Sequence, residues 1–307
     1  MDSVLIGVDG GGTKTHYLLA RGHTVVDRLD GGPTNHEALT GAYDEALSEL
    51  GDRLHELLGR HGLGPAEVAS AAFGLSGVDN RLQQRLMSDG ITALGFRRFV
   101  VANDGFLAVK AGCRSGFGIA FNAGTGTCLA GIDPTGAMRQ VNGLGEFSGD
   151  FTGGDILAAR TYRAVYDHLF RRGPQTCLVT TVMARLNANS AEELVDALQH
   201  RDPLWVRDLV GLLFEAANVG DAVALALVDA VVAEALASIG GLVDALDFPS
   251  SGVELVLSGS IHLKADSRVL VERLGAALDA QHPGLFRLGR LDLDPVEGAL
   301  AWARSLL

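Results

Sequence analysis

Apolar residues recur first with strand spacing and then with helix spacing along the first 112 residues. Residues 3–9, 14–21 and 24–30 have the pattern of three strands joined by short turns. Helical spacing follows over 36–61, and we expect Thr34 and Glu37 to form the capping box of this helix. The pattern further predicts, in order, strand 68–75, helix 80–89, strand 96–102 and helix 105–112.

The strand–loop–strand pattern of residues 4–20 returns over residues 116–131. In both places an apolar run leads into a tip rich in Gly and Thr and then into a second apolar run. This internal repeat predicts two domains of related plan that face each other across a cleft. A chance recurrence of two Gly-Thr hairpins is the alternative.

Helical patterns dominate after residue 150. We expect helices at 153–171, 178–187, 190–199, 204–217, 221–246, 267–280 and 296–306, and strands at 254–257 and 285–288. The alanine-rich stretch 222–238 is typical of a closely packed, buried helix. Pro295 is expected near the start of the last helix, where proline is favoured.

Composition and charge narrow the classes of partner. The 307 residues, 47% of them apolar and 20% charged, are enough for two domains. A net charge of −12 disfavours nucleic acid and anionic membrane surfaces as partners. Without a run of 18 apolar residues or a basic-then-apolar start, the sequence predicts a soluble cytoplasmic protein. Three scattered cysteines, none in C-x-x-C, indicate neither zinc nor disulfides, and we expect them to be buried.

The segment Asp9–Thr15 carries the clearest chemistry. An apolar run ends at Asp9, and three glycines then allow a tight turn whose N–H groups can approach a ligand. Thr13 separates Gly12 from Lys14, which excludes a P-loop, and the strand that follows excludes a dinucleotide fingerprint. A carboxylate at the end of a buried strand needs a cation or hydrogen-bond donors. The segment therefore suits a magnesium–nucleoside triphosphate, with an ordinary Gly-rich hairpin as the alternative.

Six motifs stand in order along nearly the whole chain: Asp9–Thr15, Thr34–His36, Asn103–Gly105, Gly124–Thr127, Gly143–Gly145 with Gly149 and Asp150, and Leu257–Ser260. Together they resemble the sugar kinase/Hsp70/actin ATPase superfamily, and within it the N-acetylglucosamine kinases and the BadF/BadG/BcrA/BcrD ATPase group. The resemblance implies an α/β fold of two ribonuclease-H-like (actin-like ATPase) domains with a cleft between them. It places one domain at 1–104 plus the C-terminal helix 295–307, and the other at 105–294.

The resemblance also implies ATP and Mg²⁺ as cofactors and a homodimer as the assembly. Asp9 would hold Mg²⁺ mostly through water. The implied nucleotide contacts are Gly11, Gly12, Thr13, Lys14, Gly124, Thr125, Gly126, Gly220, Gly259 and Ser260.

Asp104 matches the catalytic aspartate of the family. Transfer of a γ-phosphoryl group to a sugar needs the acceptor hydroxyl to be oriented and relieved of its proton. A carboxylate directly after the strand 96–102 can point into a cleft and do this. Asp is also favoured as the N-cap of the helix 105–112, and one residue can serve both roles.

The implied sugar contacts are Asn35, Asp104, Gly143, Leu144, Gly145 and Asp150. Asn and Asp side chains read hydroxyl groups through fixed donors and acceptors. As alternatives, Asn35 could be a turn residue, Asp150 the N-cap of a helix starting near 152, and His36 a first-turn helix residue. The family usually has Trp at the position of Leu144 and Glu at that of Phe151, and these departures bear on the identity of the substrate more than on phosphoryl transfer.

The leading interpretation is an ATP-dependent kinase for the 6-hydroxyl of an amino sugar, first of all N-acetylglucosamine, with another hexose or glucosamine as alternatives. A second hypothesis is an ATP-hydrolysing activator of a reductase or dehydratase, whose relatives ligate an iron–sulfur cluster through cysteines. The scattered cysteines argue against it. A third is a nucleotide-dependent regulator without catalysis; no basic patch or helix-turn-helix precedes Gly7, which disfavours a DNA-binding regulator.

Overall fold

The structure is a computed structural model and describes residues 2–200 and 203–307. The chain forms two compact units. Unit 1 comprises residues 1–120, 130–140 and 291–307, and unit 2 comprises 121–129 and 141–290. These bounds differ from the sequence-based division at residue 104, because strands β6 (Gly118–Ala123) and β7 (Thr127–Ile132) each contribute residues to both units. The domain division at residue 104 stays a prediction.

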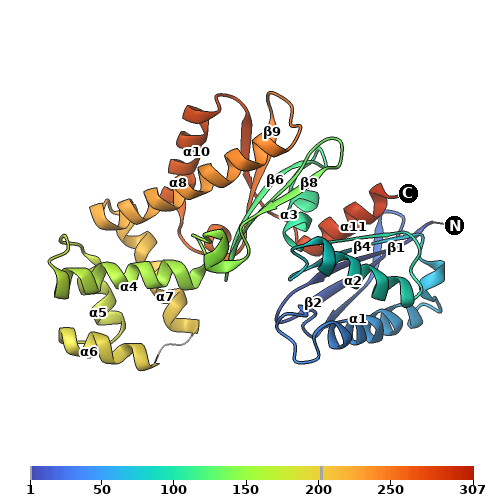
Figure 1. The fold of residues 1–307 in the computed structure, drawn as a ribbon, viewed down its shortest axis with the longest axis horizontal. Helices are drawn as coiled ribbons and strands as arrows, with labels where there is room; N and C mark the ends of the chain where they lie inside the picture. Colours follow the sequence, from blue (N-terminus) through green and yellow to red (C-terminus); the bar gives the residue numbers. More distant parts are fainter. Residues whose placement is uncertain (1, 201–202) are drawn as a thin grey trace. The chain divides into compact units, whose positions relative to one another are not determined.

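Unit 1 is built on a five-stranded sheet with the order β3-β2-β1-β4-β5 (Figure 1). Its strands are β1 (Val4–Gly10), β2 (Thr15–Arg21), β3 (Thr24–Gly31), β4 (Ser70–Leu75) and β5 (Phe99–Ala102). β1 pairs antiparallel with β2 but parallel with β4, and β4 pairs parallel with β5. The carboxyl ends of these three parallel strands therefore meet at one edge of the sheet, where ligands usually bind in α/β proteins.

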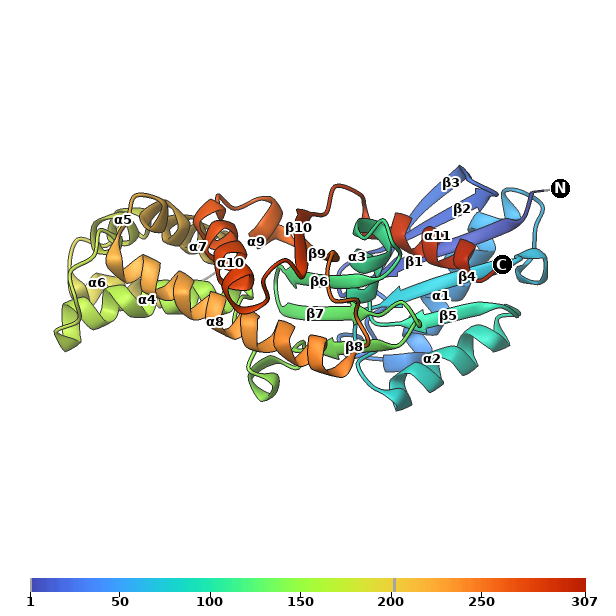
Figure 2. The ribbon, with the colours of Figure 1, turned by 90° about the horizontal axis from the view of Figure 1, so that it is seen from above.

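Side chains of β1 alternate between the two faces of this sheet. On one face Val4, Ile6 and Val8 join a core with residues of α1 (Ala42–Gly59) and α2 (Arg81–Ala93). The other face is covered by α11 (Pro295–Ser305), which packs on β1 and β4 and lies beside α3 (Gly105–Gly112) (Figure 2). A short 3₁₀ turn, η1 (Pro65–Glu67), precedes β4.

Two glycines let α11, α3 and the sheet approach closely. A Cβ on Gly7 of β1 would lie 2.8 Å from the backbone nitrogen of Leu300 in α11. A Cβ on Gly298 would lie 2.8 Å from the backbone nitrogen of Ala111 and would also overlap the carbonyl oxygen of Leu107. The last helix is thus locked onto unit 1 by backbone-to-backbone contact.

The second sheet has the order β10-β9-β6-β7-β8, which repeats the plan of the first sheet. Its other strands are β8 (Met138–Val141), β9 (Val253–Ser258) and β10 (Phe286–Arg290). Strands β6, β7 and β8 correspond to β1, β2 and β3, and β9 and β10 correspond to β4 and β5. The internal repeat predicted from the sequence is confirmed as a repeat of topology.

Unit 2 is largely helical outside its strands. The helices are α4 (Gly154–Arg171), α5 (Leu178–Arg185), α6 (Ala191–Asp196), α7 (Pro203–Asn218), α8 (Ala222–Ala245), α9 (Ser260–Leu263) and α10 (Arg268–Gln281), with 3₁₀ turns η2 (Gly145–Ser148) and η3 (Ala197–His200). Among the described helices, α8 is the one long and apolar enough to cross a membrane. One face of α8 is buried against α10, α7 and α4.

The predicted start of the first helix is wrong. Helix α1 begins at Ala42 and not near residue 36. Its N-cap is Gly41, which has no side chain that could form a cap hydrogen bond. The hydroxyl of Thr34, placed in a capping box by the sequence pattern, instead lies 2.9 Å from that of Thr15. A capping box does form at the start of α2, where Asn80 accepts from the backbone N–H of Gln83.

Candidate active site

The residues of the predicted first phosphate loop form a hairpin tip between β1 and β2, as the sequence predicts. The N–H of Gly11 donates to the carbonyl oxygen of Lys14 (3.0 Å), which closes the turn. Gly12, Thr13 and Lys14 are exposed at the tip. Their backbone groups are therefore available to an anionic ligand, as a Gly-rich turn allows.

Asp9 is the penultimate residue of β1, next to this tip, and is half-buried. Burial raises the pKa of its carboxyl from 3.8 to about 6; nearby His16 and Lys14 oppose this rise, and Asp294 adds to it. Within the described residues, no side-chain hydrogen bond to the Asp9 carboxylate is found. A partly buried carboxylate in this situation fits a cation ligand.

Asn35 is held against the ends of β1 and β4. The carbonyl oxygen of Gly11 accepts from the backbone N–H groups of Thr34 (3.0 Å) and Asn35 (3.3 Å). The side-chain amide of Asn35 donates to the hydroxyl of Ser76 (3.4 Å), and its oxygen accepts from the N–H of Glu37 (2.9 Å). Asn35 is therefore a turn residue whose amide stands at the same sheet edge as the phosphate loop.

His36 was expected in the first turn of a helix, and this expectation is wrong. It precedes α1, is buried, and stacks on Tyr43 with ring centroids 4.1 Å apart. Burial lowers the pKa of its imidazole, so the ring is held in its neutral form. His36 packs under the turn that presents Asn35.

Asp104 follows β5 and is half-buried at the start of α3. It occupies the N-cap position, but its side chain makes no cap hydrogen bond; the oxygen of Asn103 accepts from the N–H of Gly105 instead (2.8 Å). Burial, and after it the negative charges of Asp9 and Asp79, raise the pKa of the Asp104 carboxyl to about 7. A carboxyl with such a pKa is matched to proton transfer near neutral pH.

The predicted residues of the second phosphate loop lie in unit 2, between β6 and β7. Gly124 donates to the carbonyl oxygen of Gly126 (3.0 Å) and accepts from the N–H of Gly154 at the start of α4 (2.9 Å). A Cβ on Gly153 would lie 2.5 Å from the carbonyl oxygen of Thr125. The loop is therefore seated directly on the first residues of α4.

The predicted adenosine loop adjoins this second phosphate loop. Gly259 has φ of +85°, and a Cβ there would lie 2.5 Å from the carbonyl carbon of Ala123 at the end of β6. Ser260 opens the short helix α9. Gly220 lies in the turn between α7 and α8. Two residues before it, the side chain of Asn218 donates to the carbonyl oxygen of Asp266 (2.9 Å), which lies between α9 and α10.

Asp150 closes the loop that holds Gly143 and Gly145. Its carboxylate accepts from the N–H groups of Gly143 (2.9 Å) and Gly145 (3.3 Å) and from the hydroxyl of Ser148 (2.7 Å). The helix that follows begins at Gly154 with Gly153 as its cap, so the N-cap alternative for Asp150 is wrong. Leu144 is 57% exposed, which leaves it available to a ligand.

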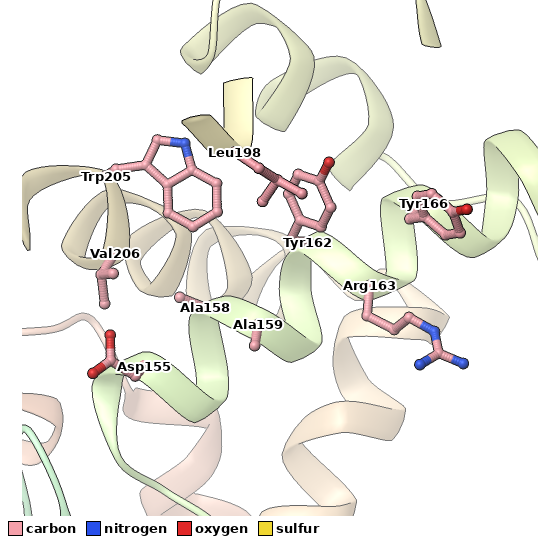
Figure 3. A pocket seen from close by; sticks show the side chains of 9 residues that line it. All are labelled: Asp155, Ala158, Ala159, Tyr162, Arg163, Tyr166, Leu198, Trp205 and Val206. Carbon is pink, nitrogen blue, oxygen red and sulfur yellow. The ribbon is translucent and has the colours of Figure 1, made fainter. Parts of the chain in front are cut away.

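A pocket of about 540 Å³ lies along α4 in unit 2 (Figure 3). Its lining residues are Asp155, Ala158, Ala159, Tyr162, Arg163, Tyr166, Leu198, Trp205 and Val206. Tyr162 and Trp205 face each other across it with centroids 5.8 Å apart. None of these residues was predicted from the sequence, and the pocket holds none of the predicted nucleotide or sugar contacts.

The three cysteines do not gather. Cys113 is buried, Cys128 is half-buried and Cys177 is exposed, so the expectation that all three are buried is wrong for Cys177. In the part of the chain that the structure describes, no group of three or more His, Cys, Asp or Glu side chains could hold a metal ion.

Sequence reasoning missed Asp79, which accepts hydrogen bonds from Asn103 and Gln140. A signal was present, since Asp79 is a carboxylate that comes shortly after the buried strand β4, as Asp104 comes after β5.

Named relatives cover most of the chain. The N-acetylmuramic acid/N-acetylglucosamine kinase of Clostridium acetobutylicum is 26% identical over 262 residues, which are 84% of this chain and 85% of that protein. The N-acetyl-D-glucosamine kinase of Dictyostelium discoideum is 26% identical over 240 residues, 74% of this chain and 75% of that protein.

Solved structures share the fold. A candidate N-acetylglucosamine kinase from Chromobacterium violaceum is 24% identical, with a TM-score of 0.69 over 97% of this chain and 98% of that one. A ROK hexokinase from Thermus thermophilus has a TM-score of 0.52 at 17% identity over 98% and 97% of the two chains. The predicted fold class, two actin-like α/β halves, is confirmed.

A family model matches residues 6–303, a range that begins in β1, ends in α11 and contains all six motifs. The chain therefore belongs to the BadF/BadG/BcrA/BcrD ATPase family.

Proposed function

We propose that this protein is an ATP-dependent kinase that phosphorylates the 6-hydroxyl of an amino sugar, N-acetylglucosamine first of all. The observation that carries the proposal is Asp104, a half-buried carboxyl at the edge of the sheet where Asp9 and Asn35 also lie. Its pKa, raised to about 7, suits a group that takes a proton from an alcohol. The names of the two curated relatives support the substrate class.

The residues of unit 1 fit a magnesium ion at Asp9. Mg²⁺ is usually bound through one or two carboxylates together with waters and substrate phosphates, so a lone aspartate is sufficient. When bound, Mg²⁺ neutralises charge that develops on the phosphate oxygens. Thr13 and the exposed backbone of the hairpin tip would hold the same phosphates, and the family resemblance implies Thr125 and Gly126 as further nucleotide contacts.

Asn35 and Asp104 would orient the sugar. Asn35 offers an amide nitrogen and oxygen, and Asp104 in its ionised form accepts a hydrogen bond from the hydroxyl that becomes phosphorylated. As the hydroxyl oxygen forms its bond to the γ-phosphorus, the bond from that phosphorus to the β–γ bridging oxygen breaks, ADP leaves, and Asp104 takes the hydroxyl proton. The family resemblance implies Gly143, Leu144 and Gly145 as further sugar contacts, and Asp150 holds their loop through its hydrogen bonds to Gly143 and Gly145.

The alternative of an activator that carries an iron–sulfur cluster finds no cysteine cluster within the described residues. Cytoplasmic location, expected from the sequence pattern, and a homodimer, expected from the resemblance, are further parts of the proposal. Light scattering would test the dimer through a molar mass of twice 32.1 kDa.

The deciding experiment is a panel of sugars, amino sugars and anhydro-sugars in a coupled assay of ADP release with Mg-ATP. We expect N-acetylglucosamine to give the highest kcat/KM, and Asp104→Ala to abolish turnover while ATP binding, measured by calorimetry, persists. Near-full activity of Asp104→Ala would overturn the mechanism. ADP release that no sugar stimulates would overturn the kinase assignment.

A further inference from the structure

Asp79 sits in the turn that joins β4 to α2, yet its carboxylate does not cap that helix. The cap is Asn80, whose side-chain oxygen accepts from the N–H groups of Leu82 and Gln83, both at 3.0 Å. The side chain of Gln83 in turn accepts from the backbone N–H of Asp79 (2.9 Å). Asn80 thus already provides the N-cap hydrogen bonds that an Asp at the start of a helix usually provides.

The Asp79 carboxylate instead holds two side-chain amides. One of its oxygens, Oδ1, accepts from Nδ2 of Asn103 and from Nε2 of Gln140, each at 2.8 Å. Asn103 is 6% exposed, so a wrong orientation of its amide would leave buried polar groups mispaired. Because a carboxylate can only accept, it obliges Asn103 to turn its NH₂ toward Asp79.

This orientation decides where the other end of the Asn103 amide points. Its oxygen faces the N–H of Gly105 and accepts from it at 2.8 Å. Asn103 and Gly105 flank Asp104, so the backbone is fixed on both sides of that residue. The side chain of Asp104 makes no cap hydrogen bond to α3.

We propose that Asp79 is a positioning residue for Asp104, acting through the side chain of Asn103. The inference rests on the proposed kinase function for its kinetic consequence, although the placement of Asp104 can be tested without any activity. The negative charge of Asp79 also contributes, after burial and Asp9, to the raised pKa of Asp104.

Three variants separate orientation from charge and from fold. Asp79→Ala removes the acceptor, whereas Asp79→Asn keeps a side-chain oxygen that can accept from both amides. Asn80→Ala is the matched control, because it removes the cap of the same helix without touching Asn103. Thermal melting of each variant reports on folding.

We expect Asp79→Ala to lower kcat about ten- to hundredfold with the KM for ATP unchanged, because the catalytic carboxyl is misplaced while the nucleotide site is intact. Asp79→Asn should retain kcat within about threefold, since its oxygen keeps the hydrogen bonds. Asn80→Ala should melt at a lower temperature with kcat unchanged.

A crystal structure of Asp79→Ala provides the readout that does not depend on turnover. The proposal expects the Asn103 amide to rotate and the contact between its oxygen and the N–H of Gly105 to lengthen beyond hydrogen-bonding distance. An unmoved Asn103 and Asp104 would overturn it, as would a kcat equal to that of the wild type. A wild type inactive with every sugar would count against the kinase, and the crystal structure alone would then decide the positioning role.

Discussion

The raised pKa of Asp104 predicts that the catalytic site costs stability in a pH-dependent way. A carboxyl whose pKa rises from 3.8 to about 7 on folding binds its proton more tightly in the native state than in the unfolded chain. Its contribution to stability is therefore fully present below pH 3.8 and is lost progressively as the pH rises to about 7. Replacement by Asn, which never ionises, removes this loss.

The size of the effect follows from the shift. A rise of this extent corresponds to about 4 kcal/mol between the two protonation states. Asp104 is half-buried, so solvent screening lowers the expected gain, and we expect Asp104→Asn to be about 2–4 kcal/mol more stable than the wild type at pH 8. At pH 5, well below the folded pKa, the difference should fall to about half or less.

Urea denaturation at pH 5, 6, 7 and 8 in EDTA, without nucleotide, measures this difference directly. Asp52→Asn is the control, because it removes one exposed negative charge from the same unit. The same Asp104→Asn protein should lose kinase turnover by at least about hundredfold, since no general base remains. A stability difference that stays flat from pH 5 to pH 8, or a variant less stable at pH 8, would refute the reasoning.

Three further predictions use other parts of the molecule. Gly298→Ala should lower the free energy of unfolding by about 1–3 kcal/mol, because the added Cβ has no room against α3. Gly240→Ala, whose added Cβ would meet no atom within 4 Å, should be neutral or stabilising, and thermal melting compares the two variants. Asp9→Asn should abolish the dependence of ATP turnover on Mg²⁺ concentration together with most of kcat, as a magnesium titration would show. Asp150→Ala should raise the KM for the sugar by about tenfold or more with the KM for ATP unchanged, because Gly143 and Gly145 lose the acceptor that fixes their N–H groups.

The buried strands and the long amphipathic helices could be predicted from the sequence because their pattern is set by local burial. Strands β1 and β4 are nearly continuous apolar runs, as parallel strands covered on both faces should be. Strand β8 was missed because it is short and partly exposed, with Arg139 and Gln140 at its centre. No run of apolar residues marks such an edge strand.

The start predicted for helix α1, at residue 36 and not at Ala42, shows that a local sequence signal can mislead. Thr34 followed by Glu37 has the pattern of a capping box, but the hydroxyl of Thr34 is used by Thr15, which itself donates to the carbonyl oxygen of Gly32. A tertiary hydrogen bond between segments 19 residues apart thus overrides a local preference. Sequence spacing carries no information about that competition.

The candidate site could be located by its motifs but not by its internal bonds. Asp9 and Asp104 are far apart along the chain, and the parallel pairing of β1, β4 and β5 brings their strand ends to one edge. Asn35 follows β3 and is held at the same edge by the hydrogen bond from its N–H to the carbonyl oxygen of Gly11. For Asp150, the sequence predicted a ligand contact but not the hydrogen bonds that this residue makes within its own loop. It was predicted as a sugar contact, and the structure gives it three partners within its own loop, so any sugar would meet it through its remaining lone pairs.

The three parallel strands of unit 1 each deliver a carboxylate near their carboxyl ends: Asp9, Asp79 and Asp104. Burial is the main reason why the pKa of Asp9 is raised to about 6 and that of Asp104 to about 7, and for Asp104 the negative charges of Asp9 and Asp79 contribute to the rise. A fold retains such an arrangement where function requires it. Binding of a divalent cation at Asp9 must favour the ionised form of that carboxyl and, by removing part of the repulsion, of Asp104 as well. Proton release and cation binding would therefore be linked at this edge, so that in the proposed mechanism Asp104 would be ionised, and able to accept a proton, more readily when a cation is held at Asp9.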